Sequence, residues 1–273
     1  MRRLLPTIAA LALAACHHSD KFDNPNAMVN DSAPVKATAP QAVELKAADG
    51  KPVFGIYYPV TNPKALILLF HQAGSSSGEY KDIAPRLQRE GYASLAIDQR
   101  IGGNLYGPNR TMAAAGVRPQ SATSGPDPDF LSALPDLEGA LAWAKDKAAG
   151  APIVLWGSSY SASEVFLLAA SSSAKGAVKA VLAFSPGEYF NDKLMVEHAA
   201  AKVSVPVFVT SANTVGEIDE AKPILAATKS LDRLQYVPQA GVHGSSTLNA
   251  NKNPGGADEN WRAVLGFLKR QFP

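Results

Sequence analysis

The chain has 273 residues, of which 46% are hydrophobic and 18% charged, and its formal net charge is +2. This composition is typical of a folded globular protein rather than of a disordered or membrane-spanning chain. Two of its basic residues, Arg2 and Arg3, stand at the N-terminus, and the remaining charges balance. Charge therefore gives no reason to expect a nucleic-acid partner.

We interpret residues 1–15 as a signal peptide. A basic start precedes an apolar run that is too short for a stable membrane anchor. The run ends in Leu-Ala-Ala followed by Cys16, the only cysteine, and this ending resembles a bacterial lipobox. The resemblance implies lipid attachment to Cys16 and, because His17 follows it, an outer-membrane location facing the periplasm. The alternative is an ordinary secretory signal with a chance cysteine.

Residues 16–41 are expected to form the lipidated cysteine and a flexible tether, because they are rich in Pro, Asn, Asp, Ser and Ala and lack an apolar period. The His17–His18 pair in this segment is a weak metal-site candidate. The single cysteine allows no intrachain disulfide. Residues 42–273 show no further shift in composition, so we predict one domain there.

The domain begins with a predicted hairpin, because apolar segments flank Asp49-Gly50. Strands and helices then alternate. The predicted strands are 65–70, 92–97, 152–156, 178–184, 205–210 and 231–237, and the predicted helices are 79–90, 129–149, 160–170, 217–230 and 259–271. This alternation predicts an α/β fold with a mostly parallel sheet of about eight strands and helices on both faces.

Residues 100–128 interrupt the alternation, because they are rich in Gly, Asn, Ser and Pro. A long irregular segment in a compact domain is usually functional or disordered. Arg100 and Arg110 in it are candidates for binding a substrate carboxylate, and solvated loop charges are the alternative. The segment is too short for a large lid domain, which favours small, accessible substrates.

The sequence WGSSYSAS, 156–163, lies between a predicted strand and a predicted helix. A residue at the apex of so short a turn needs small neighbours two positions before and after it. Ser159 meets this condition, with Gly157 before it and Ser161 after it, whereas Ser158 would have Trp156 and Tyr160. The pattern is that of a nucleophile elbow, Gly-x-Ser-x-Gly, with Ser in place of the last Gly.

A serine nucleophile needs a base to take its proton. Among the five histidines, His243 lies in a Gly-flanked loop between the last strand and the last helix, at the edge where the elbow opens. We therefore predict His243 as the base. Backbone N–H groups of Ala73 and Tyr160 are the predicted oxyanion hole, and Gln72, the neighbour of Ala73, is a further candidate for binding the substrate. His71 is expected to hold that turn in place.

These segments resemble the α/β-hydrolase superfamily, and in particular dienelactone-hydrolase-like serine hydrolases. The resemblance rests on Phe-His-Gln-Ala-Gly at 70–74, Gly-Glu-Tyr at 78–80, Asp-Gln-Arg at 98–100, the elbow at 156–161 and Val-His-Gly at 242–244. It implies the chain order nucleophile, acid, histidine. Ser161 replaces the usual Gly, and Ser159 stands where dienelactone hydrolase itself has a cysteine.

In this superfamily the acid usually follows the strand that comes two after the elbow strand. Glu217 and Asp219 lie there, and we favour Glu217 because it is nearer to the strand. Asp219 is also expected in a first helical turn, where its charge would favour the helix dipole. Glu188, after the preceding strand, is a third candidate, because some members take the acid from that position.

We thus expect a carboxylesterase-like serine hydrolase that acts on a small ester through an acyl-enzyme, without cofactor or metal. An acyltransferase or peptidase with the same residues, and a catalytically silent envelope protein of the same fold, are the alternatives. The sequence identifies neither the substrate nor the oligomeric state.

Overall fold

The computed structural model describes residues 38–116, 129–148 and 150–273. The predicted signal peptide, Cys16 and the tether up to residue 37 lie outside these ranges, as does the part of the irregular segment at 117–128. Within the described ranges, no helix is both long and apolar enough to cross a membrane.

An eight-stranded sheet forms the centre of the domain, in the order β1-β2-β4-β3-β5-β6-β7-β8. β1 pairs antiparallel with β2 and β2 with β4, whereas every later pairing is parallel. This confirms the predicted antiparallel start and mostly parallel sheet. The strands are β1 Gln41–Lys46, β2 Pro52–Tyr58, β3 Leu66–Phe70, β4 Ala93–Asp98, β5 Ile153–Ser158, β6 Val178–Phe184, β7 Val207–Thr210 and β8 Arg233–Tyr236.

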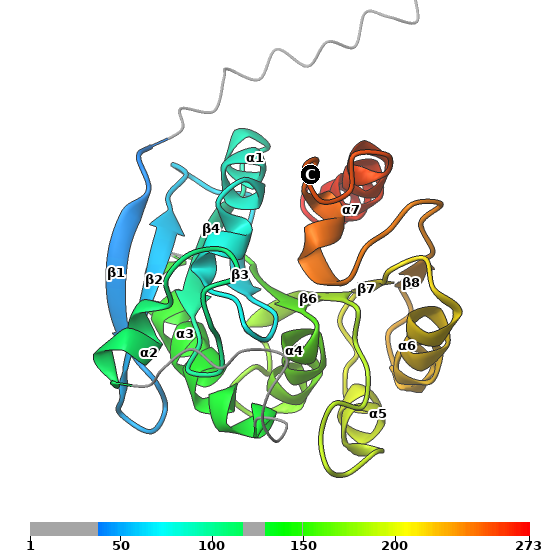
Figure 1. Ribbon diagram of the computed structural model, residues 1–273, viewed down its shortest axis with the longest axis horizontal. Coiled ribbons are helices and arrows are strands. Elements are labelled where there is room, and N and C mark those ends of the chain that lie inside the picture. Colours follow the sequence, from blue (N-terminus) through cyan, green and yellow to red (C-terminus); the bar gives the residue numbers. More distant parts are fainter. Residues whose placement is uncertain (1–37, 117–128, 149) are drawn as a thin grey trace, which may run out of the picture. The chain divides into compact units, whose positions relative to one another are not determined.

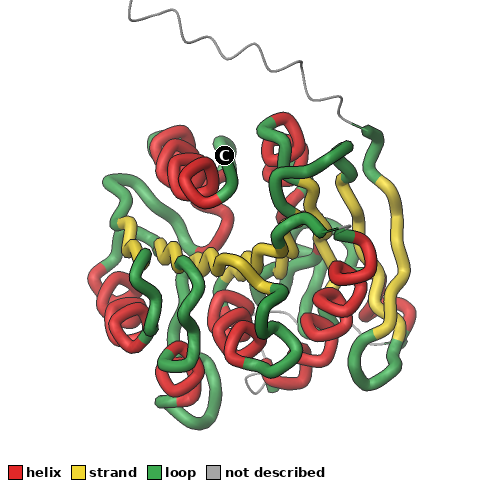
Figure 2. Tube along the Cα trace, turned by 180° about the vertical axis from the view of Figure 1, so that it is seen from behind, coloured by secondary structure: helices red, strands yellow, loops and turns green. Residues whose placement is uncertain are grey.

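Helices cover both faces of this sheet (Figures 1 and 2). One face carries α1 (Ile83–Arg89) and α7 (Ala257–Gln271). The other face carries α3 (Leu134–Lys147), α4 (Tyr160–Ala170), α5 (Met195–Ala200) and α6 (Val215–Ala227). The remaining short helices are η1 Ser77–Tyr80, α2 Arg110–Ala114, η2 Phe130–Ala133 and η3 Gly244–Leu248.

The helix predicted at 79–90 is divided into η1 and α1. Pro85 stands in the first turn of α1, where its missing N–H costs little. If one helix ran through from Glu79, the Pro85 ring would clash with the carbonyl of Lys81. The proline therefore separates the two helices, and Glu79 belongs to η1.

The central strands are buried on both faces, which explains their continuous apolar sequences. All five residues of β3 are buried. Ile67 and Leu69 pack with residues of α1 and α7, whereas Leu66 and Phe70 pack with residues of α3 to α6. Each such buried aliphatic side chain contributes about 1.5–3 kcal/mol. The sheet is thereby held rigidly, and it supports the loops at its carboxyl edge.

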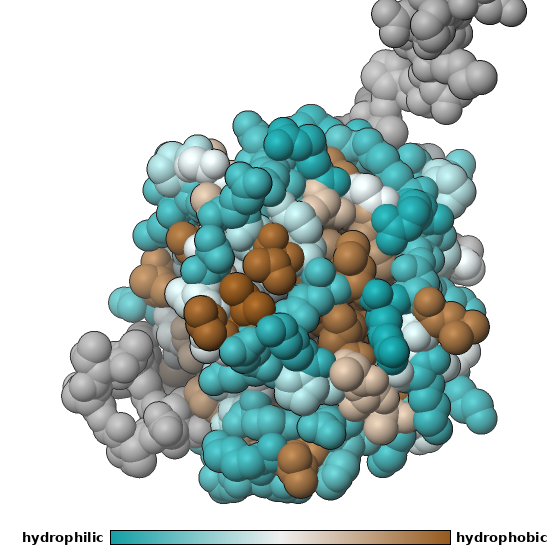
Figure 3. All heavy atoms as spheres, turned by 90° about the vertical axis from the view of Figure 1, so that its right-hand side faces the viewer, coloured by the Kyte–Doolittle hydropathy of each residue, from teal (hydrophilic) through white to brown (hydrophobic). Residues whose placement is uncertain are grey.

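The edge strand β8 pairs with β7 alone among the described strands. Leu231, Leu234 and Val237 in and beside it are exposed. Figure 3 faces this side of the molecule and shows apolar side chains gathered among polar ones. The strand has only four residues and begins with Arg233, features that discourage pairing with another sheet edge.

Candidate active site

The turn between β5 and α4 holds Ser159 in a strained conformation. Its backbone angles are φ 60° and ψ −126°, which a residue other than glycine rarely adopts. A Cβ atom at Gly157 would lie 2.2 Å from the backbone oxygen of Ser161, so only glycine fits two residues before the apex. The steric argument that selected Ser159 from the sequence therefore corresponds to the observed turn.

Ser159, His243 and Glu217 form a continuous hydrogen-bonded chain. The His243 Nε2 atom lies 2.8 Å from Ser159 Oγ, and its Nδ1 atom lies 2.9 Å from Glu217 Oε1. A carboxylate can only accept, so Nδ1 carries the proton and Nε2 accepts the Ser159 hydroxyl proton. This is the arrangement in which an imidazole can act as a base toward a serine.

The other two acid candidates have different partners. The Glu188 carboxylate accepts the N–H groups of Val196 and Glu197 at 2.9 and 2.8 Å, and so caps the start of α5. Asp219 is exposed and pairs with Lys222 on the same face of α6. Of the three candidates, the structure brings Glu217 to the imidazole.

The environment of Glu217 keeps its carboxylate ionised. Partial burial raises the pKa, but hydrogen bonds from His243, Ser185 and the Ala212 N–H, together with the charge of His243, lower it more, to about 2. The Ala212 N–H donates to Oε2 at 2.9 Å. Glu217 is therefore an anion at neutral pH, able to orient His243 and to stabilise its protonated form.

Ser185 was not anticipated from the sequence. It directly follows β6 with φ 60°, the same unusual sign as Ser159 at the end of the neighbouring β5. Its Oγ accepts the Gly244 N–H at 2.9 Å, and its side chain also lowers the pKa of Glu217. This one buried serine thus holds the histidine loop close to the end of β6. A polar residue directly after an apolar strand was the only sequence signal for it.

The predicted oxyanion turn follows β3 beside the elbow, since Phe70 lies opposite Gly157 in the sheet. Tyr160 is the first residue of α4, so its N–H has no carbonyl partner inside the helix. Within the described part of the chain, the Ala73 N–H has no acceptor either. Both predicted donors are therefore free to bind a substrate oxygen.

His71 stabilises this turn, as expected. Its Nδ1–H donates to the carbonyl of Gln72 at 2.8 Å, and its Nε2 accepts the Gln99 N–H at 2.9 Å. The Gln72 carbonyl belongs to the same peptide unit as the Ala73 N–H, so His71 orients that donor. Complete burial lowers the pKa of His71 to about 4, which keeps it neutral.

A family model described as serine aminopeptidase, S33 matches residues 61–217, which is more than half of the chain. The chain belongs to the serine aminopeptidase S33 family. The matched range contains Ser159 and Glu217, whereas His243 lies beyond its end. A search of curated proteins finds no match.

Solved structures similar to this S33 family member have the α/β-hydrolase fold. An esterase from Pyrococcus furiosus is 18% identical with a TM-score of 0.61, covering 86% of this chain and 92% of its own. A dienelactone hydrolase from Anabaena variabilis is 16% identical with a TM-score of 0.65, covering 86% and 100%. A carboxyl esterase from Bacillus coagulans is 11% identical with a TM-score of 0.63, with the same coverage. This confirms the expected fold.

The structure gives Arg100 and Arg110 partners other than a substrate. Arg100 bonds Asp49 and the buried Asp136 through its guanidinium at 2.6 to 3.0 Å. Arg110 Nε donates to the buried Asp98 at 2.9 Å. Both arginines thus pair with carboxylates of the protein itself, and their role as binders of a substrate carboxylate stays a prediction.

Gln72, the third substrate-binding candidate, lies at the site but bonds within the protein. Its Nε2 donates to Ser246 Oγ at 3.4 Å, and its backbone N–H donates to Glu79 at 2.9 Å. The Ser246 hydroxyl also bonds Tyr106. Gln72 thus helps to form the wall of the site between the oxyanion turn and the histidine loop.

Aromatic side chains form another part of this S33 family member's site. The Phe130 ring stacks on Tyr160 at 4.7 Å and meets Tyr189 edge-on at 6.3 Å. The Tyr189 hydroxyl donates to the Ser185 carbonyl at 3.0 Å. Because Tyr160 directly follows Ser159 in the chain, the stacked aromatic rings lie beside the nucleophile elbow.

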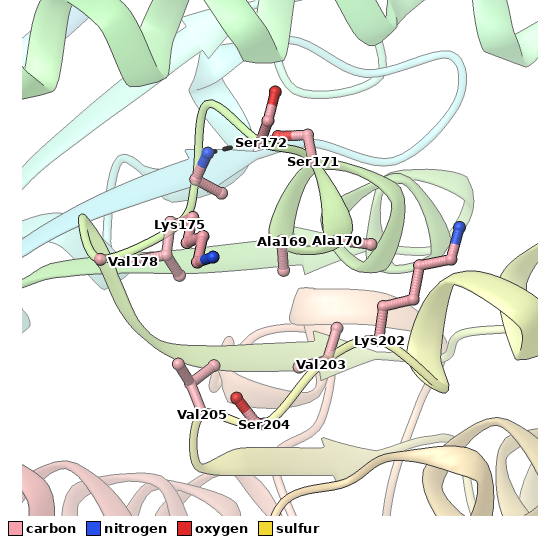
Figure 4. A pocket seen from close by; sticks show the side chains of 12 residues that line it. Ala169, Ala170, Ser171, Ser172, Lys175, Val178, Lys202, Val203, Ser204 and Val205 are labelled. Carbon is pink, nitrogen blue, oxygen red and sulfur yellow. Dashed lines mark hydrogen bonds between the residues drawn. The ribbon is translucent and has the colours of Figure 1, made fainter.

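A hollow of about 370 Å³ lies elsewhere, at the amino edge of the parallel strands (Figure 4). It is lined by the end of α4 and by the segments that precede β6 and β7, with Lys175 and Lys202 among its residues. Both lysines are exposed, and the C-terminal end of α4 lies beside them. Among the described residues, no cluster of His, Cys, Asp and Glu could hold a metal.

Proposed function

We propose that the protein is a serine hydrolase that cleaves small carboxylic esters through an acyl-enzyme on Ser159. The observation that carries the proposal is the hydrogen-bonded chain from Ser159 through His243 to Glu217 beside two free backbone donors. The names of the similar structures support an ester as substrate.

The reaction follows from these positions. His243 Nε2 takes the Ser159 proton as Oγ attacks the carbonyl carbon, and the N–H groups of Ala73 and Tyr160 bind the oxyanion. The C–O bond to the alcohol then breaks, and His243 returns the proton to the leaving oxygen. Water repeats the sequence on the acyl-enzyme: His243 takes its proton, the acid is released, and the proton returns to Ser159.

Electrostatics favour this sequence. Negative charge develops on the oxyanion while positive charge develops on the imidazole. The oxyanion faces the N–H groups of Ala73 and Tyr160, and the imidazole faces the Glu217 carboxylate. Loss of one oxyanion donor costs about 2.7–4 kcal/mol in comparable enzymes. The Glu217 anion stabilises the imidazolium without taking its proton.

Labelling with a fluorophosphonate, followed by peptide mapping, tests the proposal. We expect the adduct on Ser159 and its loss in Ser159→Ala. Ser163→Ala is the matched control. The Ser163 hydroxyl exchanges hydrogen bonds with the backbone of Gly187 and makes no contact with the imidazole among the bonds of the described residues. Absence of labelling in folded wild-type protein would mean a catalytically silent member of the fold.

The family description favours a second candidate, hydrolysis of an aminoacyl amide by the same residues. A panel of short-chain nitrophenyl esters and aminoacyl anilides separates the two. We expect turnover of the esters to exceed that of the anilides by orders of magnitude. Adding alcohol or amine acceptors and analysing the products distinguishes transfer from hydrolysis.

We further propose that the mature protein is lipid-anchored through Cys16 at the outer membrane and faces the periplasm. The support is the sequence Leu-Ala-Ala-Cys at the end of the apolar run, with His17 after it. Incorporation of labelled palmitate into the wild type, and its absence in Cys16→Ala, is the expected result. Unlabelled wild-type protein would contradict it.

A further inference from the structure

Glu79 is a buried carboxyl group that the triad does not include. It lies in η1 with only 2% of its surface exposed. Burying a carboxylate is expensive unless hydrogen bonds compensate for the lost water. Its contacts therefore indicate what the group does.

Both carboxylate oxygens accept a hydrogen bond from a neighbouring segment. Oε2 accepts the Gln72 N–H at 2.9 Å, and Oε1 accepts the Ser158 hydroxyl at 2.7 Å. The Ser158 Oγ in turn accepts the Ser245 N–H at 2.8 Å. One carboxylate thus joins three loops that are far apart in the sequence.

Each of the three hydrogen-bonded residues lies within two positions in the sequence of a residue that takes part in the proposed reaction. Gln72 precedes the oxyanion donor Ala73, Ser158 precedes the nucleophile, and Ser245 lies two residues after His243. Gly244 between them fits closely, because a Cβ there would lie 2.4 Å from Ser158 Oγ. The spacing of the three loops therefore depends on these bonds.

We propose that Glu79 is a positioning residue that holds the oxyanion turn, the nucleophile elbow and the histidine loop in their reactive arrangement through its two accepted hydrogen bonds. The proposal rests on the proposed function, because it assigns Glu79 a part in that same reaction. Glu79 acts through Gln72 and Ser158 and does not touch the substrate.

The arrangement favours the ionised form. A proton on Oε1 would have to be donated to Ser158 Oγ, and the Ser158 hydroxyl proton would then lose the carboxylate as its acceptor. Burial raises the pKa of Glu79, hydrogen bonds and the charge of His243 lower it less, and the result is about 7. The observed pattern of donors and acceptors is therefore favoured more strongly as the pH rises through that value.

Among the described residues, the hydrogen-bond partners of Glu79 include no lysine or arginine. The titratable groups around it are His243 on the loop after β8, Tyr106 on the loop after β4, Tyr160 on α4, Tyr80 on η1, and, farther along the same segments, His71 and the Arg110-paired Asp98.

The pH profile of kcat/KM for ester hydrolysis tests the proposal. In the wild type, loss of the Glu79 proton should add its own inflection to the acid limb of log kcat/KM and make that limb steeper. In Glu79→Gln we expect this inflection to be absent and the plateau to be lowered about 10- to 100-fold, mainly in kcat, because positioning errors of this kind act on the reaction step.

Glu164→Gln is the matched control. Glu164 is equally buried and lies one turn into α4, and burial raises its pKa well above the ordinary value, but its carboxyl oxygens have no hydrogen-bond partner among the described residues. Its amide variant should keep the wild-type slope and plateau. An unchanged slope and plateau in Glu79→Gln would overturn the proposal, whereas an inactive wild type would instead contradict the proposed function.

If Glu79→Gln does not fold, Ser158→Ala tests the positioning role of Glu79 instead. It removes one of the two donors and leaves the carboxyl group in place. The pKa of Glu79 should then rise, and the second inflection of the acid limb should move to higher pH. An acid limb identical to that of the wild type would overturn the proposal.

Discussion

Glu79 should make the protein less stable as the pH rises. Its ordinary pKa of 4.5 is raised to about 7 in the fold, so between these values the native state holds a proton that the unfolded chain has lost. The free energy of unfolding therefore falls with increasing pH across this range. At about 1.4 kcal/mol for each pKa unit, the loss is about 3 kcal/mol.

Thermal unfolding of the wild type and of Glu79→Gln, followed by circular dichroism between pH 4.5 and 9, measures this loss. For a domain of this size, about 3 kcal/mol corresponds to a change in Tm of about 6–12 °C. The Tm of the variant minus that of the wild type should rise by this amount up to pH 7 and then level off. The other titrating groups cancel in this difference.

Glu164→Gln provides a comparison at a second buried carboxyl group. Burial raises the pKa of Glu164 well above the ordinary value, so the corresponding difference in Tm should also rise with pH, whereas kcat should stay at the wild-type value. A Glu79→Gln difference that stays constant within about 2 °C across the range would refute the reasoning, since it would show that burial does not perturb Glu79.

Three further changes test other parts of the site. Glu217→Gln should lower kcat about 10²- to 10⁴-fold, because the amide cannot stabilise the imidazolium, while Asp219→Asn stays within about twofold of the wild type in steady-state assays. His71→Leu should cost about 2–6 kcal/mol in urea denaturation, because it leaves the Gln72 carbonyl and the Gln99 N–H buried and unpaired. Gly157→Ala should reduce fluorophosphonate labelling of Ser159 more than 100-fold, because the added Cβ would displace the start of α4 and with it the nucleophile. Labelling close to that of the wild type would contradict the steric argument.

Glu79 also illustrates a conflict between stability and activity. The ionised carboxyl that we propose for catalysis is the form whose burial costs stability. Active sites commonly retain such unfavourable groups, and replacing them tends to stabilise the fold while lowering activity. Opposite effects of Glu79→Gln on Tm at pH 8 and on kcat would fit this relation.

Local chain geometry determined what could be predicted from the sequence. The strand and helix alternation, the choice of Ser159 and the role of Gly157 depend on residues within a few positions of one another. The role expected for His71 also depends on its immediate neighbour, the Gln72 carbonyl. Position in the chain order was enough for His243, because the carboxyl ends of parallel strands share one edge of the sheet.

Long-range packing decided the rest. The three acid candidates differ little in sequence, and only the placement of α6 against the histidine loop brings Glu217 within 2.9 Å of His243. Arg100 looked like a free loop charge because its partners Asp49 and Asp136 lie 51 and 36 residues away. Glu79 belongs to the Gly-Glu-Tyr segment of the family resemblance, but its role could not be predicted, because its contact with Ser158 spans 79 residues. Hydrogen bonds between loops depend on where the sheet places their ends, and this information exists only in the folded chain.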